Sequence, residues 1–332
     1  MMSHQLPGQV DSQRFAYGRS SGVEVAPTQP RSALPPVTHE PFWEPTPVLP
    51  GGGELEEYAP TRQDPELFPV VPSFTPPASM ELPRADLAEL FPAMSLAEVN
   101  ARASLQTRVD NKYLLSGEQF SRFARGLAAQ NDWSGVDVDG ERKFAYRSVY
   151  FDTPDLLTFR QHRQGRRRRF KFRTRSYLNS GDCMFEVKLR GARSATMKRR
   201  LSYSLADAEV ITDEAHEFLS QALFDAYGMR PPAGLSAVTR TDYQRQTLVQ
   251  HSQSARLTCD SAFTCSTARR EVTAKPMWVV ESKTEKGRGA ADRLLVSMGI
   301  RPRRISKYCL ATAILHPHLS ANKWSRARRE WF

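Results

Sequence analysis

Residues 168–200 read RRFKFRTRSYLNSGDCMFEVKLRGARSATMKRR, and in two parts of this stretch every second residue is charged. The first part places Lys171, Arg173 and Arg175 between Phe and Thr residues, and the second places Glu186 and Lys188 between Phe, Val and Leu. Successive side chains of a strand point to opposite faces of a sheet. The pattern therefore predicts two strands with one apolar and one charged face. A row of cations around a glutamate indicates a site for a polyanion and a metal.

A solvated charged face is the competing explanation. Antiparallel sheets commonly expose one polar face to solvent. Any one of these strands taken alone is better explained as part of such a solvated face. A related pattern recurs later in the chain, where Arg256 precedes an E-S-K sequence that begins at Glu281. Several such strands together favour a functional site.

Charge and proline are distributed unevenly along the 332 residues. Residues 1–100 contain 17 of the 23 prolines, no lysine, five arginines and 13 acidic residues, although the whole chain has a formal net charge of +11. We therefore expect residues 1–85 to be an acidic, Pro-rich disordered arm. Residues 86–320 should form one domain with a sizeable core, followed by a basic tail over residues 321–332. Such a basic domain indicates an anionic partner, whether nucleic acid, nucleotide, polyphosphate or a membrane surface.

Several classes of protein lack their signatures here. No run of 18 apolar residues is present, which predicts no membrane span, and the start, MMSHQLPGQVDSQ, lacks the apolar region of a signal peptide. The four cysteines form no C-x-x-C pair, and the chain has no P-loop, zincin or G-x-S-x-G motif. We therefore expect a cytoplasmic protein with reduced thiols and a site built mainly from cations and carboxylates.

Hydrophobic periodicity predicts many antiparallel strands with a few helices between them. Besides the two charged strands, strands are expected at 107–115, 145–151, 237–248, 255–268, 276–284 and 305–315. Helices are expected after a capping box that starts at Ser116, over 213–227 and over 289–298. Antiparallel strands with a charged inner face can close around a polar tunnel. The expected fold is therefore α+β, a closed antiparallel β-barrel tunnel with a few packed helices.

The charged residues on these strands suit phosphoryl transfer. Arginine contacts two phosphate oxygens at once, lysine supplies a compact charge, and closely spaced cations repel unless an anion lies among them. One or two carboxylates would hold Mg²⁺ or Mn²⁺, which bridges phosphate oxygens. Positioning and charge neutralisation dominate this chemistry. A terminal phosphate acceptor is already anionic, which agrees with the lack of a candidate catalytic histidine.

At these residues the chain resembles the VTC domain, the catalytic domain of the vacuolar transporter chaperone polyphosphate polymerase, within the CYTH or triphosphate tunnel metalloenzyme superfamily. The resemblance covers about residues 105–315 through seven motifs in the family's order. These are RVDNKYLL, SVYFDT, FKFRTRSY, FEVKLRG, TDYQRQT with ARLTCD, WVVESKT and RRISKY. The resemblance implies a tunnel fold, ATP and polyphosphate as ligands, and Mn²⁺ or Mg²⁺ as cofactor.

The resemblance also implies roles for individual residues. Catalytic contacts to the reacting phosphates are implied for Arg173, Arg175, Lys188, Arg245, Arg256 and Lys307. Further phosphate binding is implied for Lys112, Arg163, Lys198 and Tyr243, and the charged-strand pattern adds Lys283 and Arg304. Glu281 matches the metal-binding glutamate, and Glu186 is a second acidic candidate. Two positions differ from the family, because Asp110 replaces a glutamate and Arg304 replaces the lysine of eukaryotic members, which keeps the charge but changes the geometry.

The leading hypothesis is a polyphosphate polymerase that transfers the terminal phosphate of ATP to a growing polyphosphate chain. Two alternatives remain open from the sequence. With water as the acceptor, the same cations would serve a metal-dependent triphosphatase for inorganic or nucleoside triphosphates. Without turnover, they would serve a module that binds polyphosphate, inositol phosphates or nucleic acid, and the C-terminal sequence KWSRARREWF would suit nucleic acid.

Overall fold

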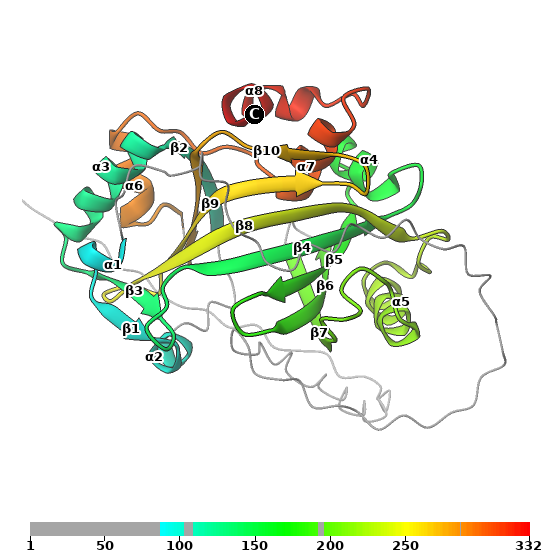
Figure 1. Ribbon diagram of the computed structural model, residues 1–332, viewed down its shortest axis with the longest axis horizontal. Helices are drawn as coiled ribbons and strands as arrows, with labels where there is room; N and C mark the ends of the chain where they lie inside the picture. The colour runs from blue at the N-terminus through cyan, green and yellow to red at the C-terminus, as the bar shows by residue number, and fades with distance from the viewer. Residues whose placement is uncertain (1–86, 103–108, 192–195, 286) are drawn as a thin grey trace, which may run out of the picture. The chain divides into compact units, whose positions relative to one another are not determined.

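The computed structural model describes residues 87–102, 109–191, 196–285 and 287–332. The acidic arm predicted over residues 1–85 lies outside these residues. The described chain is built around one large sheet with helices packed against it (Figure 1). None of the described helices has both the length and the apolar character needed to cross a membrane.

Eight strands form the main path of the sheet, in the order β2-β11-β9-β8-β4-β5-β6-β7, and every neighbouring pair along it is antiparallel. Three short strands branch from this path, since β3 pairs with β8, β10 pairs with β9, and β1 runs parallel to β3. The strands are β1 (Ala93–Ser95), β2 (Val109–Ser116), β3 (Trp133–Asp137), β4 (Phe144–Asp152), β5 (Phe170–Tyr177), β6 (Asp182–Arg190), β7 (Thr196–Tyr203), β8 (Ser236–Gln250), β9 (Arg256–Ser266), β10 (Glu271–Thr273) and β11 (Met277–Thr284).

Closure of the predicted barrel is the part of the fold class that needs correction. The antiparallel sheet and its packed helices are confirmed. However, the two end strands, β2 and β7, share no ladder among the described residues, so the sheet is open rather than a closed barrel. Closure would require two edges that lie about 80 residues apart in the chain to pair, and no local sequence pattern encodes that pairing.

The helices cover the apolar side of the strands. Phe172, Phe185 and Val187 of β5 and β6 form a core cluster with Ala215 and Leu219 of α5, as the alternation of charged and apolar residues predicts. A second cluster joins α3 and α6 to β2 and β11. The helices are α1 (Leu87–Leu90), α2 (Leu96–Arg102), α3 (Gly117–Ala128), α4 (Leu157–Gln164), α5 (Asp213–Tyr227), α6 (Ala290–Ser297), α7 (Lys307–Leu315) and α8 (Ser325–Trp331), with a 3₁₀ turn at Asn322–Trp324.

The strand predicted at 305–315 is wrong, because this segment forms the helix α7. Ser306 caps the helix by accepting a hydrogen bond from the backbone N–H of Cys309 at 3.4 Å. Every residue from Tyr308 to Leu315 is buried. A helix that is apolar on all sides has no 3.6-residue periodicity, so its sequence is easily mistaken for a buried strand.

The C-terminal segment also differs from its prediction as a basic tail. Trp324 and Trp331 are buried, with exposed fractions of 4% and 1%, and the ring of Trp331 lies 4.6 Å from that of Phe263 on β9. Figure 1 shows α8 beside α7 and β10, and the arginines of α8 are on a helix whose aromatic side chains belong to the core. The segment is therefore an integral part of the fold.

Candidate functional site

A cavity of about 250 Å³ lies against the charged face of the sheet. Its walls come from the central strands, from both sheet edges β2 and β7, and from the start of α7. Nine basic side chains line it, against two carboxylates, Asp110 and Glu281. The basic residues are Lys112, Arg169, Lys171, Arg173, Arg175, Lys188, Arg190, Arg245 and Lys307. Such an excess of positive charge suits an anion that carries several negative charges.

The structure brings most of the predicted site residues to this cavity. Those that line it are Lys112, Arg173, Arg175, Lys188, Tyr243, Arg245, Glu281 and Lys307. Six others lie outside the lining: Arg163, Glu186, Lys198, Arg256, Lys283 and Arg304. Arg163 donates a hydrogen bond to the backbone oxygen of Ser320, and the side chain of Arg304 is exposed.

Lys112 and Glu281 face each other across the ladder between β2 and β11. The ammonium nitrogen of Lys112 lies 2.8 Å from a carboxylate oxygen of Glu281. Two residues along, Lys283 is opposite Asp110, so cations and carboxylates alternate on this face. Burial would raise the pKa of Glu281, but the charges of Lys112 and Lys283 outweigh it and hold this pKa well below the usual range. Glu281 is therefore ionised at neutral pH.

Glu186 balances the charge of the two strands that flank β6. Its fully buried carboxylate lies 2.8 Å from Arg173 on β5, 3.3 Å from Arg200 on β7 and 3.8 Å from Arg175, and it also pairs with Lys198. Because four cations surround this carboxylate and it does not line the cavity, we assign Glu186 to holding the cations in place. The predicted metal-binding role is not supported by this environment.

Asp260 on β9 holds two other cavity cations in place, as Glu186 does for Arg173 and Arg175. Its carboxylate accepts hydrogen bonds from Arg245 at 2.6 and 2.8 Å and from the ammonium group of Lys307. Burial opposes ionisation, but Arg245 and Lys307 lower the pKa of Asp260 to about 2. Asp260 was not predicted as a site residue, although it is the last residue of the motif ARLTCD.

Tyrosine side chains on the sheet contact several of the cavity cations. The guanidinium of Arg245 lies 5.0 Å from the ring centre of Tyr146, and the ammonium of Lys307 lies 4.5 Å from that of Tyr243. Arg173 donates a hydrogen bond of 2.7 Å to the hydroxyl of Tyr150. These contacts hold the charged groups in fixed positions. The Tyr243 hydroxyl is buried and has no hydrogen-bond partner among the described residues, so it is available to a ligand in the cavity.

Two lysines of the cavity, and Lys198 opposite Lys188 in the ladder between β6 and β7, have pKa values below the usual range. Burial lowers the pKa of Lys188 well below its usual value, and the charge of Lys198 lowers it further. Burial also lowers the pKa of Lys198, to about 7, with Arg200 adding to the effect against the opposing charge of Glu186. The pKa of Lys171 is lowered by burial and by Lys112. An anion among these lysines would stabilise their charged forms.

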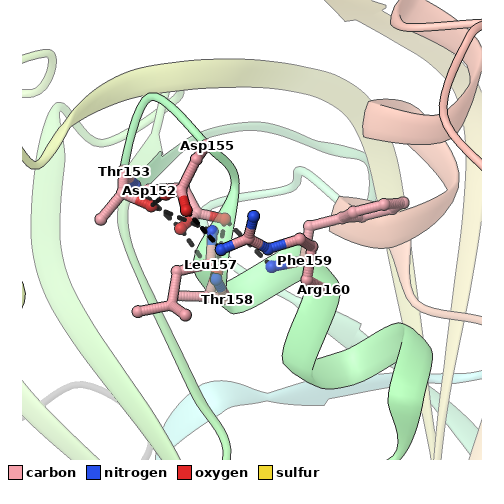
Figure 2. Close-up of polar contacts among 7 residues, drawn as sticks. All are labelled: Asp152, Thr153, Asp155, Leu157, Thr158, Phe159 and Arg160. Carbon is pink, nitrogen blue, oxygen red and sulfur yellow. Dashed lines mark hydrogen bonds and ion pairs between the residues drawn. The ribbon is translucent and has the colours of Figure 1, made fainter.

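Asp152 contacts both helices that border the cavity, and Figure 2 shows its contacts at the start of α4. One carboxylate oxygen accepts hydrogen bonds from the backbone N–H groups of Thr153 and Thr158, at 2.8 and 2.9 Å. The other accepts from the Phe159 N–H at 3.0 Å, from the Thr158 hydroxyl at 2.8 Å and from the Tyr308 hydroxyl. Asp152 thus satisfies the N-terminal N–H groups of α4 and binds the start of α7, the helix that begins with Lys307.

Two titratable lining residues, His162 and Arg169, were not predicted from the sequence, and a third, Arg190, belongs to the alternating charged residues of β6 but was given no role. The Nδ1–H of His162 donates to the backbone oxygen of Thr158 at 2.9 Å. Burial and the charge of Lys171 lower the pKa of His162 to about 3, so the ring is neutral at neutral pH. Arg169 comes from a run of four arginines before β5, where no alternation marks it. Arg190 continues the alternation of β6, the one signal that could have indicated its place.

The carboxylates of the cavity fit a hard divalent cation. No group of three or more His, Cys, Asp or Glu side chains that could hold a metal occurs in the described part of the chain. Glu281 and Asp110 would thus supply one or two oxygen ligands. Mg²⁺ and similar ions are commonly bound by one or two carboxylates together with substrate phosphates and water. The donor set therefore fits Mg²⁺ or Mn²⁺ bound jointly with a phosphate ligand.

Comparison with known proteins gives the following findings. The sequence profile of the VTC domain matches residues 103–316. No curated protein matches the sequence. A solved putative adenylyl cyclase from Hippeastrum, described as having a dominant triphosphatase activity, is 12% identical, with a TM-score of 0.40 over 63% of this chain and 97% of its own. A putative adenylate cyclase from Bacillus halodurans is 18% identical, with a TM-score of 0.36 over 66% of this chain and 96% of its own.

Proposed function

The chain belongs to the VTC domain family, and we propose that it acts on triphosphate and polyphosphate as a polyphosphate polymerase. In this reaction the terminal phosphate of ATP is transferred to the end of a growing polyphosphate chain in the presence of Mn²⁺ or Mg²⁺. The observation that carries the proposal is the cavity in which nine basic side chains face two carboxylates. Repeated phosphate groups supply the negative charge that such a cavity lacks.

The cations of the cavity would bind and orient the phosphates. Arg245 and Lys307 are anchored by Asp260, and Arg173 is anchored by Glu186 and Tyr150. Because these groups are held before a ligand arrives, little ordering remains to be done when the phosphates bind. Fixed positive charge around the transferred phosphoryl group is the main requirement of this reaction class.

Glu281, with Asp110 nearby on the adjacent strand, would hold the divalent cation. A divalent cation held by these residues would supply positive charge that offsets the negative charge of the phosphates during transfer. The chain's own contribution is to keep the carboxylate ionised, since Lys112 and Lys283 hold the pKa of Glu281 low.

The charge of the cavity favours polyphosphate over water as the acceptor. Water must lose a proton as it attacks, whereas a terminal phosphate is already anionic. The pKa values of Glu281 and His162 are both held low, which makes these two groups weak bases at neutral pH. Lys188, whose pKa burial lowers, remains available as a base. The support for the polymerase over the triphosphatase is therefore the excess of positive charge, which attracts an anionic acceptor and not water.

A direct test incubates the purified full chain with ATP and Mn²⁺ and separates the products on a gel stained for polyphosphate. We expect a ladder of products in the wild type and its loss in Lys188→Met, which removes a cavity cation. The control Lys143→Met changes an exposed lysine outside the cavity and should keep the ladder.

The products also separate the rival functions. Release of inorganic phosphate without a ladder would refute the polymerase in favour of a triphosphatase. Absence of any turnover, with tripolyphosphate binding that is lost in Lys188→Met, would point instead to a binding module.

A further inference from the structure

The segment that leads from α4 into β5 carries a row of arginines that begins on the surface and ends in the cavity. Gly165 ends α4 with a φ of 72°, and Arg166, Arg167 and Arg168 follow it with exposed side chains. Arg169 is the next residue, is partly buried and lines the cavity. The chain therefore carries four consecutive arginines, of which the first three are exposed and the last lines the cavity.

Arg190 completes this row from the neighbouring strand. Its backbone N–H donates to the backbone oxygen of Arg169 at 3.0 Å, and both arginines line the cavity. The hydroxyl of Tyr227 on α5 lies 2.9 Å from the backbone oxygen of Arg169 and 2.8 Å from that of Arg190. Arg169 also donates to the backbone oxygen of Arg166 at 2.6 Å. The segment is thus held in place by backbone contacts, which leave its charges uncompensated.

No carboxylate pairs with any of these five arginines in the part of the chain that the structure describes. Inside the sheet, by contrast, Glu186 and Asp260 neutralise part of the positive charge. Burial and the charge of Arg190 lower the pKa of Arg169. Adjacent cations without counter-ions repel one another, and the arrangement becomes favourable when an anion lies along it.

We propose that Arg166, Arg167, Arg168, Arg169 and Arg190, here called the arginine row, bind a polyphosphate chain where it leaves the cavity. This proposal rests on the proposed function and extends it to the path of the product. A polymer that grows in a cavity of about 250 Å³ has to leave it, and the arginine row is continuous with the cavity lining. Guanidinium groups bind phosphate oxygens, and this contact does not depend on any other group in the ligand.

The scarcity of exposed aromatic side chains distinguishes this surface from a site for single-stranded nucleic acid. Sites for single-stranded nucleic acid combine positive charge with aromatic side chains on which bases stack. Among the exposed large apolar residues of the described chain Phe224 on α5 is the one aromatic, so the surface offers no series of rings on which successive bases could stack. A row of arginines without aromatic residues fits a bare chain of phosphates.

The test measures equilibrium binding to the full chain without ATP, using tripolyphosphate, a long polyphosphate of defined length and a single-stranded RNA. The triple variant Arg166→Ser, Arg167→Ser, Arg168→Ser removes the exposed part of the arginine row. Its control, Arg122→Ser, Arg230→Ser, Arg301→Ser, removes the same charge from exposed positions elsewhere.

In the row variant we expect the affinity for long polyphosphate to fall at least tenfold, and the slope of log K against log salt to become shallower by about two. Tripolyphosphate should bind within about twofold of wild type, because its partners lie inside the cavity. The control variant should bind both ligands as wild type does. Under polymerase conditions the row variant should give shorter products.

Unchanged affinity for long polyphosphate would overturn the proposal, as would an equal loss for tripolyphosphate. RNA that binds the wild type as tightly as polyphosphate, with the same loss in the row variant, would also overturn it and indicate a nucleic-acid surface. Because binding is measured without turnover, a selective loss for the long chain supports the arginine row even if no polymerase activity is found. Activity with unchanged long-chain binding would refute only the arginine row.

Discussion

The ammonium group of Lys112 lies 2.8 Å from the carboxylate of Glu281, across the ladder between β2 and β11. The cation that would bind phosphate and the carboxylate that would bind metal are thus already paired with each other. A metal ion that arrives alone competes with Lys112, and a phosphate that arrives alone competes with Glu281. A metal–phosphate complex satisfies both partners at once, so we expect metal and triphosphate to strengthen each other's binding.

Replacing Glu281 by Gln should break this coupling. Removal of one negative charge from the cavity wall frees Lys112, so tripolyphosphate without metal should bind about tenfold more tightly. Mn²⁺ should no longer increase that affinity. Calorimetric titration with and without Mn²⁺ measures both effects. Glu118→Gln, on an exposed position of α3, is the matched control. A Mn²⁺ effect in Glu281→Gln equal to that of wild type would contradict the assignment of the metal site.

Replacing Glu186 by Gln should destabilise the fold. The substitution leaves Arg173, Arg175, Lys198 and Arg200 around a neutral group, and removing one partner of a buried charge cluster costs about 3–5 kcal/mol. Tripolyphosphate should recover part of the loss because it supplies negative charge nearby. Denaturant unfolding with and without tripolyphosphate provides the measurement, with Glu217→Gln on the exposed side of α5 as control. A loss below about 1 kcal/mol would argue against this role.

Anion binding should be linked to proton uptake through Lys188. Its folded-state pKa is lowered by burial and by Lys198, whose own pKa is lowered to about 7. At pH 8 Lys198 is largely neutral, and a bound anion raises the pKa of both lysines, so binding takes up protons. At more acidic pH Lys198 is already charged, so the uptake falls.

Titration calorimetry in buffers of different ionisation enthalpy counts these protons. Lys188→Met should take up fewer protons than wild type at pH 8, because one lysine with a lowered pKa is lost. The exposed variant Lys143→Met should match wild type. The same lowered pKa values affect stability. Without ligand, the unfolded chain binds more protons than the folded chain above pH 7. The contribution of these lysines to the free energy of unfolding therefore rises with pH in that range.

Replacing Tyr308 by Phe should weaken the link between α4 and α7. The substitution removes one donor from the buried carboxylate of Asp152, which keeps its hydrogen bonds to α4, so we expect a loss of about 1–3 kcal/mol in unfolding free energy. Because Lys307 precedes Tyr308, tripolyphosphate should also bind more weakly. Thermal unfolding and titration test the two effects. Tyr177→Phe is the control, since its hydroxyl has no hydrogen-bond partner among the described residues, and an equal effect there would contradict the prediction.

More of the candidate site than of the fold could be predicted from the sequence. On β5 and β6 each residue's face follows from its position alone, so the inward direction of Arg173, Arg175 and Lys188 could be predicted and is confirmed by the cavity lining. In α7 the same reasoning failed, because a helix buried on every side shows no period. Asp260 and His162 were missed for another reason. Asp260 is opposite Arg245 in the ladder between β8 and β9, and His162 reaches the cavity from α4, so these contacts depend on strand register and helix packing that no local pattern fixes.

The open edges of the sheet determine how the cavity can respond to its contents. Asp110 and Lys112 come from β2 and Thr196 comes from β7, yet no backbone ladder joins these two strands in the described residues. The two walls are joined only through the strands between them along the described sheet, so repulsion among their charges acts on the spacing without a direct ladder to resist it. We expect a bound polyanion to relieve that repulsion and draw the walls together. The ligand would then fix the width of its own channel, and a chain of identical charges would keep that width constant as it grows.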